Sequence, residues 1–201
     1  MIPIAISQRV TIIPGREERR DSLDQKWMDF LCLCGLSPVI IPNNIDSANA
    51  ALEHTAVKGV LLTGGDDLVS YGGDAPERDA TERFLLRYCL DRKLPLLGVC
   101  RGMQLLQDHF GVKLTKVAGH AATSHSIEMD GQRVSVNSFH NFAALESTAD
   151  LEVKARSDDG VIEAVSHKYF PAQGIMWHPE RNGPFQESDI NFFMAFFHTE
   201  V

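Results

Sequence analysis

Long apolar runs are missing from this chain, and no stretch approaches the roughly 20 residues that a membrane-spanning helix needs. Positive charge is also scarce, because 19 Lys and Arg stand against 27 Asp and Glu and give a formal net charge of −8 at pH 7. A general nucleic-acid binder needs a cationic surface to displace phosphate counterions. We therefore expect neither a membrane nor a nucleic acid as a partner. A small anionic substrate stays possible, since a few arginines suffice to hold one.

Cysteine is equally sparse. The four cysteines (Cys32, Cys34, Cys89 and Cys100) have neither the spacing of a secreted disulfide framework nor that of a zinc site. The first three are best interpreted as small buried apolar residues. Residues 1–7 lack the basic region and the apolar length of a signal peptide. We expect a cytoplasmic protein without a bound metal or cofactor.

Short β-type runs alternate with amphipathic helices over the first two-thirds of the chain. This alternation predicts an α/β fold with an open, mostly parallel sheet and helices on both faces. The expected strands are 3–7, 38–41, 59–63 and 96–99, and the expected helices follow a capping box at Ser22–Gln25, a cap at Ser47, a cap at Asp79 and the segment 101–110.

The pattern changes after Gly111, which is placed to end a helix. Asp130-Gly131 predicts a small antiparallel hairpin between 126–129 and 133–136, because a type I′ turn needs positive φ. Further strands are expected at 151–155, 161–166 and 173–177, and a last helix from about 188 should bury Ile190, Phe193, Met194 and Phe197. Without repeats or a convincing linker, residues 1–201 are predicted to form a single domain.

The stretch Gly98-Val99-Cys100-Arg101-Gly102 lies between a buried-type strand and a helix, which is the context of a nucleophile elbow. A sharp turn strains the nucleophile's backbone, and side chains two residues to either side would collide. The thiol then lies at a helix N-terminus, where the macrodipole favours thiolate. The amide N–H of Arg101 can donate to an oxyanion. The alternative is a cysteine that merely packs at the start of a helix.

A thiol nucleophile needs a base, and the base needs a group that fixes its tautomer. His178-Pro179-Glu180 supplies both just after a predicted strand, because the proline holds the chain extended and lets both side chains emerge on one side. Four other histidines fall beside predicted regular elements without an evident partner and are interpreted as structural or surface residues: His54, His109, His167 and His198.

A second glycine loop, Thr63-Gly64-Gly65-Asp66-Asp67, ends the third predicted strand. Ligands bind beyond the carboxyl ends of the strands in such sheets, so the N–H of Gly65 is expected near Cys100. A phosphate cradle competes with this interpretation, but the Lys-Ser/Thr of a P-loop is missing. A plain tight turn is the other alternative.

Together these segments resemble the class I glutamine amidotransferases, and more closely their stand-alone γ-glutamyl hydrolases of the peptidase C26 type. The resemblance rests on Gly64–Asp66, Gly98–Gln104, Val136–His140 and His178–Glu180, which follow the family's order over nearly the whole chain. It implies a Cys100–His178–Glu180 triad that cleaves a γ-glutamyl amide through a thioester.

The same resemblance implies further roles. The N–H groups of Gly65 and Arg101 would hold the oxyanion, while Gln104 and the backbone of Ser138, Phe139 and His140 would hold the glutamyl group. Arg9 is a candidate at the substrate mouth. Asn141 and Phe142 follow His140 where the family often has His and Gln, which puts substrate preference in doubt.

Within this group, the compact length and the stretches Leu62–Leu68 and Glu77–Glu82 are similar to hydrolases of bacterial capsule synthesis whose leaving group is a nucleotide phosphoramidate. In that case Arg9, Arg78 and Arg181 would contact the phosphates at the rim of the active site. Two other functions stay open. The chain could be a glutaminase subunit that supplies ammonia to a separate synthetase, although no synthetase segment is present, or a non-catalytic binding domain.

Overall fold

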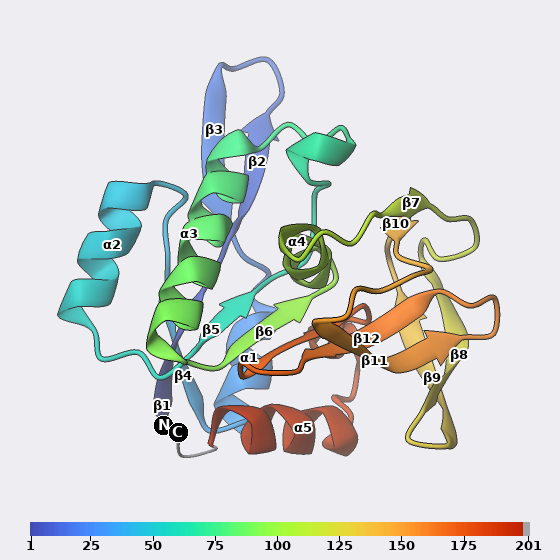
Figure 1. Cartoon of the computed structure of the whole chain (residues 1–201). Coiled ribbons are helices and arrows are strands. Elements are labelled where there is room, and N and C mark those ends of the chain that lie inside the picture. The colour runs from blue at the N-terminus through green and yellow to red at the C-terminus, as the bar shows by residue number, and fades with distance from the viewer. Residues whose placement is uncertain (199–201) are drawn as a thin grey trace.

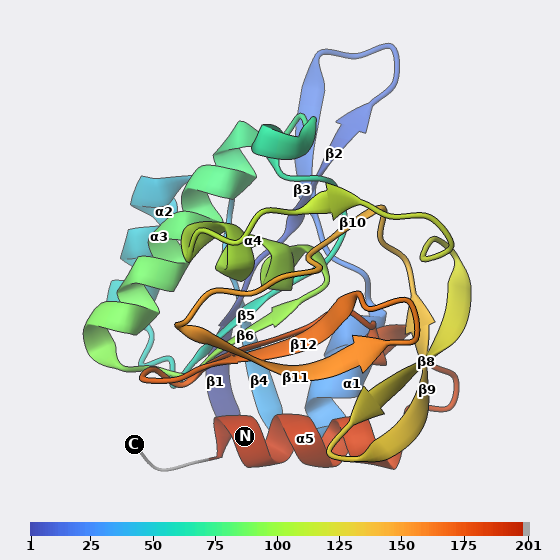
Figure 2. The same ribbon diagram turned by 45° about the vertical axis from the view of Figure 1, so that its right-hand side comes forward.

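A computed structural model describes residues 1–198, and the last three residues of the predicted domain lie outside this range. Its centre is a nine-stranded mixed sheet with the strand order β4-β1-β5-β6-β13-β12-β11-β8-β9. Helices cover both faces of this sheet (Figures 1 and 2), as the sequence predicts.

One half of the sheet is parallel and the other half is antiparallel. The parallel strands are β1 (Ile2–Ile6), β4 (Leu36–Ile40), β5 (Val60–Leu62), β6 (Leu96–Val99) and β13 (Ala172–Ile175). The antiparallel strands are β8 (Thr123–Met129), β9 (Gln132–Ser138), β11 (Leu151–Ser157) and β12 (Ile162–His167). The predicted hairpin forms, with φ of 51° at Asp130 and 72° at Gly131, and it extends the main sheet.

The helices divide into two layers. α2 (Ile45–His54), α3 (Pro76–Arg92) and α4 (Arg101–His109) contribute to the core on one face, and α1 (Lys26–Leu33) and α5 (Glu187–Phe197) contribute to the core on the other. Side chains of β1 alternate between these cores, with Ala5 in the first and Ile4 and Ile6 in the second. None of the helices within residues 1–198 has both the length and the apolar character needed to cross a bilayer.

A projecting hairpin, β2 (Arg9–Ile13) and β3 (Glu18–Ser22), is not anticipated by the sequence analysis (Figure 1). β3 consists of charged and polar residues only, and β2 is a run of five residues that exposes most of its side chains, so neither strand presents a clear apolar face to the sequence analysis. Ser22 pairs with Arg9 in this hairpin, and the predicted capping box is therefore wrong. Asp24 instead accepts a hydrogen bond from the N–H of Lys26.

Two other predicted caps are also wrong. Asn44 rather than Ser47 caps α2, and its side chain accepts from the N–H of Ser47 at 3.0 Å. Asp79 lies inside α3 because that helix begins three residues earlier at Pro76. In α5, Phe193 and Phe197 are buried as predicted, but Met194 is 37% exposed.

The remaining elements are short: β7 (Thr115–Lys116) paired with β10 (Phe142–Ala143), and the 3₁₀ turns η1 (Val69–Tyr71) and η2 (Pro179–Arg181). The register places Leu62 of β5 beside Gly98 of β6, and Val99 beside Ile175 of β13. The carboxyl ends of three parallel strands therefore meet at one edge, where α/β sheets bind ligands.

Candidate active site

Cys100 forms the turn between β6 and α4. Its φ of 52° and ψ of −104° lie in a region that residues with a side chain rarely adopt. The turn is fixed on both sides, because the Cys100 N–H donates to the carbonyl of Ile175 at 2.7 Å and its carbonyl accepts from the N–H of Gln104 at 3.0 Å. The thiol residue is 5% exposed.

The flanking glycines are required by close backbone contacts. A Cβ on Gly98 would lie 2.4 Å from the carbonyl carbon of Gly102, and a Cβ on Gly102 would lie 2.3 Å from the carbonyl oxygen of Leu62. Both separations are far inside van der Waals contact. The steric need for glycine predicted from the sequence is confirmed at both positions.

His178 follows β13 and is almost fully buried, with its Nδ1 2.7 Å from Oε1 of Glu180. A Cβ built on Gly64 would lie 3.2 Å from Nε2 of His178 and 3.3 Å from Cβ of Cys100, so the imidazole and the thiol residue both adjoin Gly64. Within residues 1–198, Nε2 has no partner that meets hydrogen-bond limits. The contact with Cys100 is therefore looser than a full hydrogen bond, which is common in free enzymes.

The charge state of His178 depends on competing effects. Burial lowers its pKa, but interactions with Cys100 and Glu180 outweigh burial and raise the pKa from 6.5 to about 9. The imidazole therefore carries its proton at neutral pH. A protonated Nε2 beside a thiol residue can donate to a leaving group nitrogen.

Asn137 positions the backbone of His178, a role that the sequence analysis does not assign. Its side-chain oxygen accepts from the N–H of His178 at 2.8 Å, and its amide nitrogen donates to the carbonyl of His178 at 2.8 Å. Asn137 belongs to the segment Val136–His140, and an amide inside a strand is the one sequence signal that could have found it.

The glycine loop after β5 is held by Arg78. This guanidinium donates to the carbonyls of Thr63, Gly64 and Gly65 at 2.7, 3.0 and 2.6 Å. The N–H of Gly65 points away from Arg78, because the C=O and N–H of a trans peptide point in opposite directions. Gly65 and Cys100 line the same cavity. Arg78 is fully buried, so its predicted place among the rim arginines is wrong.

Glu82 joins the glycine loop to the nucleophile helix. Its Oε1 accepts from Nε of Arg78 at 2.9 Å and from Oγ of Ser7 at 2.8 Å, and its Oε2 accepts from Nη1 of Arg101. Burial raises the pKa of Glu82, but Arg101 and Arg78 more than offset this and lower it. The Arg101 side chain also bonds Asp79, which leaves its backbone N–H as its available group at the site.

A cavity of about 210 Å³ opens beside Cys100. Gln104 lies on its wall and donates from Nε2 to the carbonyl of Phe142 at 2.8 Å. Burial, followed by repulsion from Asp66, raises the pKa of Asp67 on the same wall. The full lining is Gly65, Asp66, Asp67, Cys100, Gln104, Phe139, His140 and Asn141.

Phe139 and His140 form part of that wall, and Ser138 directly precedes them. The Ser138 hydroxyl and the His140 N–H both donate to the carbonyl of His120, at 2.7 and 3.0 Å, so neither of these donors is free for a substrate. The Phe139 ring meets the His178 ring edge-on with centroids 5.6 Å apart. The His140 side chain is turned against Glu163.

Two predicted rim arginines, Arg9 and Arg181, line a small cavity together with His178. Arg9 lies against Gly65 and bonds Asp66 at 3.3 Å, while 45% of its side chain stays exposed. Arg181 lies 4.3 Å above the Phe139 ring. Both arginines therefore also contact residues that line the cavity beside Cys100, Arg9 through Asp66 and Arg181 through Phe139.

The four histidines interpreted as structural or surface residues lie outside this constellation. His54 is exposed at the end of α2. His167 accepts from two backbone N–H groups through Nδ1, and Nε2 of His198 lies 3.3 Å from the carbonyl of Cys34. His109 stacks edge-on against Phe110.

Comparison with known proteins agrees with this fold. The family model for class-I glutamine amidotransferase matches residues 19–197, and the chain belongs to this family, which confirms the resemblance seen in the sequence. Among solved structures, a putative GMP synthase component from Thermoplasma acidophilum matches with a TM-score of 0.74 and 20% identity, covering 98% of this chain and 93% of that one.

Curated relatives share more sequence. The chain is similar to the gamma-glutamyl-CDP-amidate hydrolase of Campylobacter jejuni subsp. jejuni serotype O:2, at 33% identity over 89% of this chain and 90% of the relative. It is also similar to the gamma-glutamyl-gamma-aminobutyrate hydrolase of Escherichia coli O157:H7, at 30% identity over 80% of this chain and 79% of the relative.

Replacing Glu82 with Gln should destabilise the fold by about 3–5 kcal/mol, because two buried guanidinium groups lose their shared counter-charge. The free energy of unfolding from urea titration measures this loss. Arg83→Met is the matched control on the same helix. It breaks a partly exposed pair with Asp108 and should cost less than about 1 kcal/mol. Equal losses in the two variants would contradict the central role of Glu82.

The raised pKa of His178 predicts a pH-dependent stability. Its folded pKa of about 9 exceeds the ordinary value of 6.5, so the stabilisation is complete below pH 6.5 and is lost as pH rises through 9. The free energy of unfolding should fall by up to about 3 kcal/mol over this window in the native protein. Urea titrations of His178→Gln should show a flatter profile. Parallel profiles would rule out the raised pKa.

Proposed function

We propose that this protein is a cysteine-nucleophile hydrolase that cleaves a γ-glutamyl amide bond and releases glutamate. One observation carries the proposal: His178 is bonded through Nδ1 to Glu180 and presents its other nitrogen beside the strained Cys100 at the sheet edge. The relatives named above act on γ-glutamyl substrates by their names, which supports the same bond class here.

The reaction starts when the sulfur of Cys100 attacks the γ-carbonyl carbon. The backbone N–H groups of Gly65 and Arg101 stabilise the oxyanion. His178 donates its proton to the leaving nitrogen as the C–N bond breaks, and a γ-glutamyl thioester remains on Cys100. His178 then takes a proton from water, which attacks the thioester and frees glutamate and the thiol. Glu180 keeps the imidazole oriented throughout.

The cavity beside Cys100 suits the glutamyl group. Asp67 contributes negative charge that favours the α-ammonium group, whereas Asp66 is paired with Arg9 and Arg78. Gln104 offers its side-chain oxygen on the same wall. The N–H of His140 already donates to the His120 carbonyl and is not free for the substrate. Any further backbone contact from this wall would therefore come from Phe139. These contacts would select glutamyl over other acyl groups.

The leaving group is proposed to carry phosphates, as in a γ-glutamyl nucleotide diphosphate amidate of capsule synthesis. Arg9 and Arg181 line the small cavity beside His178, the residue proposed to protonate the leaving group. Both are partly exposed and can form charge-assisted hydrogen bonds to phosphate oxygens. The identity to the Campylobacter relative supports this choice.

Ranking kcat/KM over a panel of γ-glutamyl amides tests the leaving group. The panel should include γ-glutamyl-CDP-amidate, γ-glutamyl-γ-aminobutyrate and glutamine. Arg9→Met and Arg181→Met should each reduce kcat/KM for the phosphate-bearing substrate about tenfold more than for glutamine, whose leaving group is uncharged. Arg16→Met, on the same hairpin as Arg9 and 70% exposed, is the control. Highest activity on glutamine would favour the ammonia-supplying glutaminase instead.

Variants of the proposed triad should lose activity unequally. Cys100→Ala should abolish turnover while substrate binding stays measurable, and His178→Ala should reduce kcat by several orders of magnitude because triad members act as a unit. Glu180→Gln should cost less, since this carboxylate orients rather than transfers protons. Single-turnover assays and calorimetric binding measure these effects. Undiminished turnover in Cys100→Ala would refute the nucleophile and revive the non-catalytic domain.

A further inference from the structure

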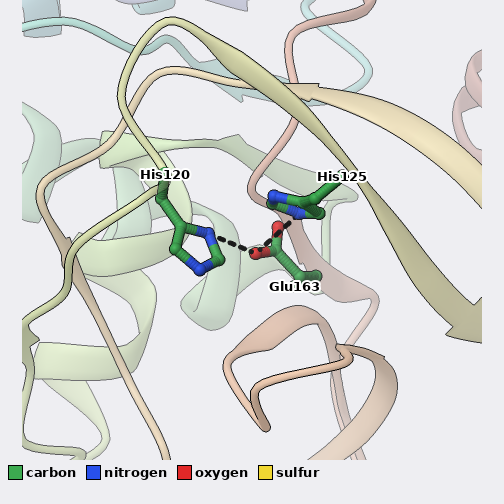
Figure 3. A group of neighbouring side chains, drawn as sticks. All are labelled: His120, His125 and Glu163. Atoms are coloured by element: carbon green, nitrogen blue, oxygen red, sulfur yellow. Dashed lines mark ion pairs between the residues drawn. The ribbon is translucent and has the colours of Figure 1, made fainter.

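Three histidines converge on one buried carboxylate behind the proposed active site. His125 comes from β8, Glu163 from β12, and His120 and His140 from the segments that precede β8 and follow β9. Figure 3 shows the His120 and His125 rings directed at Glu163. Oε1 of Glu163 lies 3.3 Å from Nδ1 of His120, 3.1 Å from Nε2 of His125 and 3.5 Å from Nε2 of His140.

These short separations are not hydrogen bonds. Within residues 1–198, both oxygens of Glu163, both ring nitrogens of His125 and His140, and Nδ1 of His120 lack a partner that meets hydrogen-bond geometry. Glu163 is fully buried, and His120 and His140 are each 3% exposed. Buried polar atoms without partners are costly, and a buried carboxylate without a cation is costlier still.

The tautomer of His120 makes the contact with Glu163 still less favourable in the absence of a cation. Its Nε2 lies 2.9 Å from Oδ2 of Asp159 in hydrogen-bond geometry, so Nε2 carries the proton in the neutral ring. Nδ1 then directs a lone pair at the carboxylate oxygen of Glu163, which also has only lone pairs to offer. A cation between the two atoms removes this repulsion. A carboxylate that orients a ligating histidine through its other nitrogen is the usual arrangement around protein-bound metals.

The distances fit a particular metal. Bonds of about 2.0–2.2 Å to a tetrahedral Zn²⁺ place neighbouring ligand atoms about 3.3–3.6 Å apart. Oε1 of Glu163 lies 3.3 Å from Nδ1 of His120 and 3.1 Å from Nε2 of His125, so the second separation would widen slightly when the ion binds. The ligand atoms of His120, His125 and Glu163 all lie within 4.8 Å of one another. Two imidazole nitrogens with one carboxylate form a typical zinc ligand set, and a water molecule would complete the tetrahedral coordination sphere.

We propose that His120, His125 and Glu163 bind one structural Zn²⁺ ion, with the His140 ring packed beside the site. This departs from the expectation of a metal-free protein, which rested on ligand spacing in the sequence. The ion would tie the segment before β8 to β8 and β12, and the His120 carbonyl accepts from the N–H of His140, which together with Phe139 forms part of the wall beside Cys100. Zinc would thereby hold this wall in place without taking part in the reaction.

Zinc content in a Cys100→Ala background tests the proposal, because that background removes the competing thiol. The metal-stripped protein, incubated with Zn²⁺ and passed through a desalting column, should retain about one zinc ion per chain and gain in melting temperature. Glu163→Gln and His125→Gln should abolish retention and the thermal shift. His54→Gln, which alters an exposed histidine at the end of α2, should retain both.

Asp159→Asn offers a variant that keeps every ligand. Asp159 is 56% exposed at its side chain, so the fold should tolerate the change, while zinc affinity should fall about 10- to 100-fold. Substitution with Co²⁺ should give the visible bands of a four-coordinate ion without thiolate charge transfer. Failure of the Cys100→Ala protein to retain zinc, or equal retention in Glu163→Gln, would overturn the proposal and leave the cluster as a histidine–carboxylate network.

Discussion

The buried carboxylate of Glu82 is the constraint on which the geometry of the site depends. It accepts from Arg78, whose guanidinium binds three successive carbonyls of the glycine loop, and from Arg101, the first residue of the nucleophile helix. The two backbone N–H groups proposed for the oxyanion, those of Gly65 and Arg101, are thus fixed through one side chain. Removing these three charged groups from water is costly, but once paired they leave little conformational freedom to the glycine loop or to the turn at Cys100.

A second set of contacts fixes the proposed base. Asn137 bonds both backbone polar groups of His178, Glu180 bonds its ring, and the Phe139 ring packs against its edge. The nucleophile and the base both follow strands of the parallel half, β6 and β13, and His178 is held in addition by Asn137 and Phe139 from the antiparallel extension. The proposed zinc ion would reinforce this extension only.

The sequence alone predicts those parts of the site whose residues lie close together along the chain. The elbow around Cys100 and the pair His178 and Glu180 each lie within a few residues, and glycine spacing or a proline reveals their geometry. Arg78, Asn137 and the Glu163 cluster act across 12 or more residues, where only tertiary packing brings the partners together. The hairpin from Arg9 to Ser22 was not predicted because β3 has no apolar residue and β2 is a short strand that packs little of its surface.

The most direct test of the account is to trap the acyl-enzyme. Mixing the protein with a γ-glutamyl amide, quenching in acid within the first turnover and mapping peptides by mass spectrometry should find a γ-glutamyl group on Cys100. Hydroxylamine should remove it, as expected of a thioester. A rapid turnover that leaves Cys100 unmodified at every quench time, or an acyl group on another residue, would contradict the proposed chemistry.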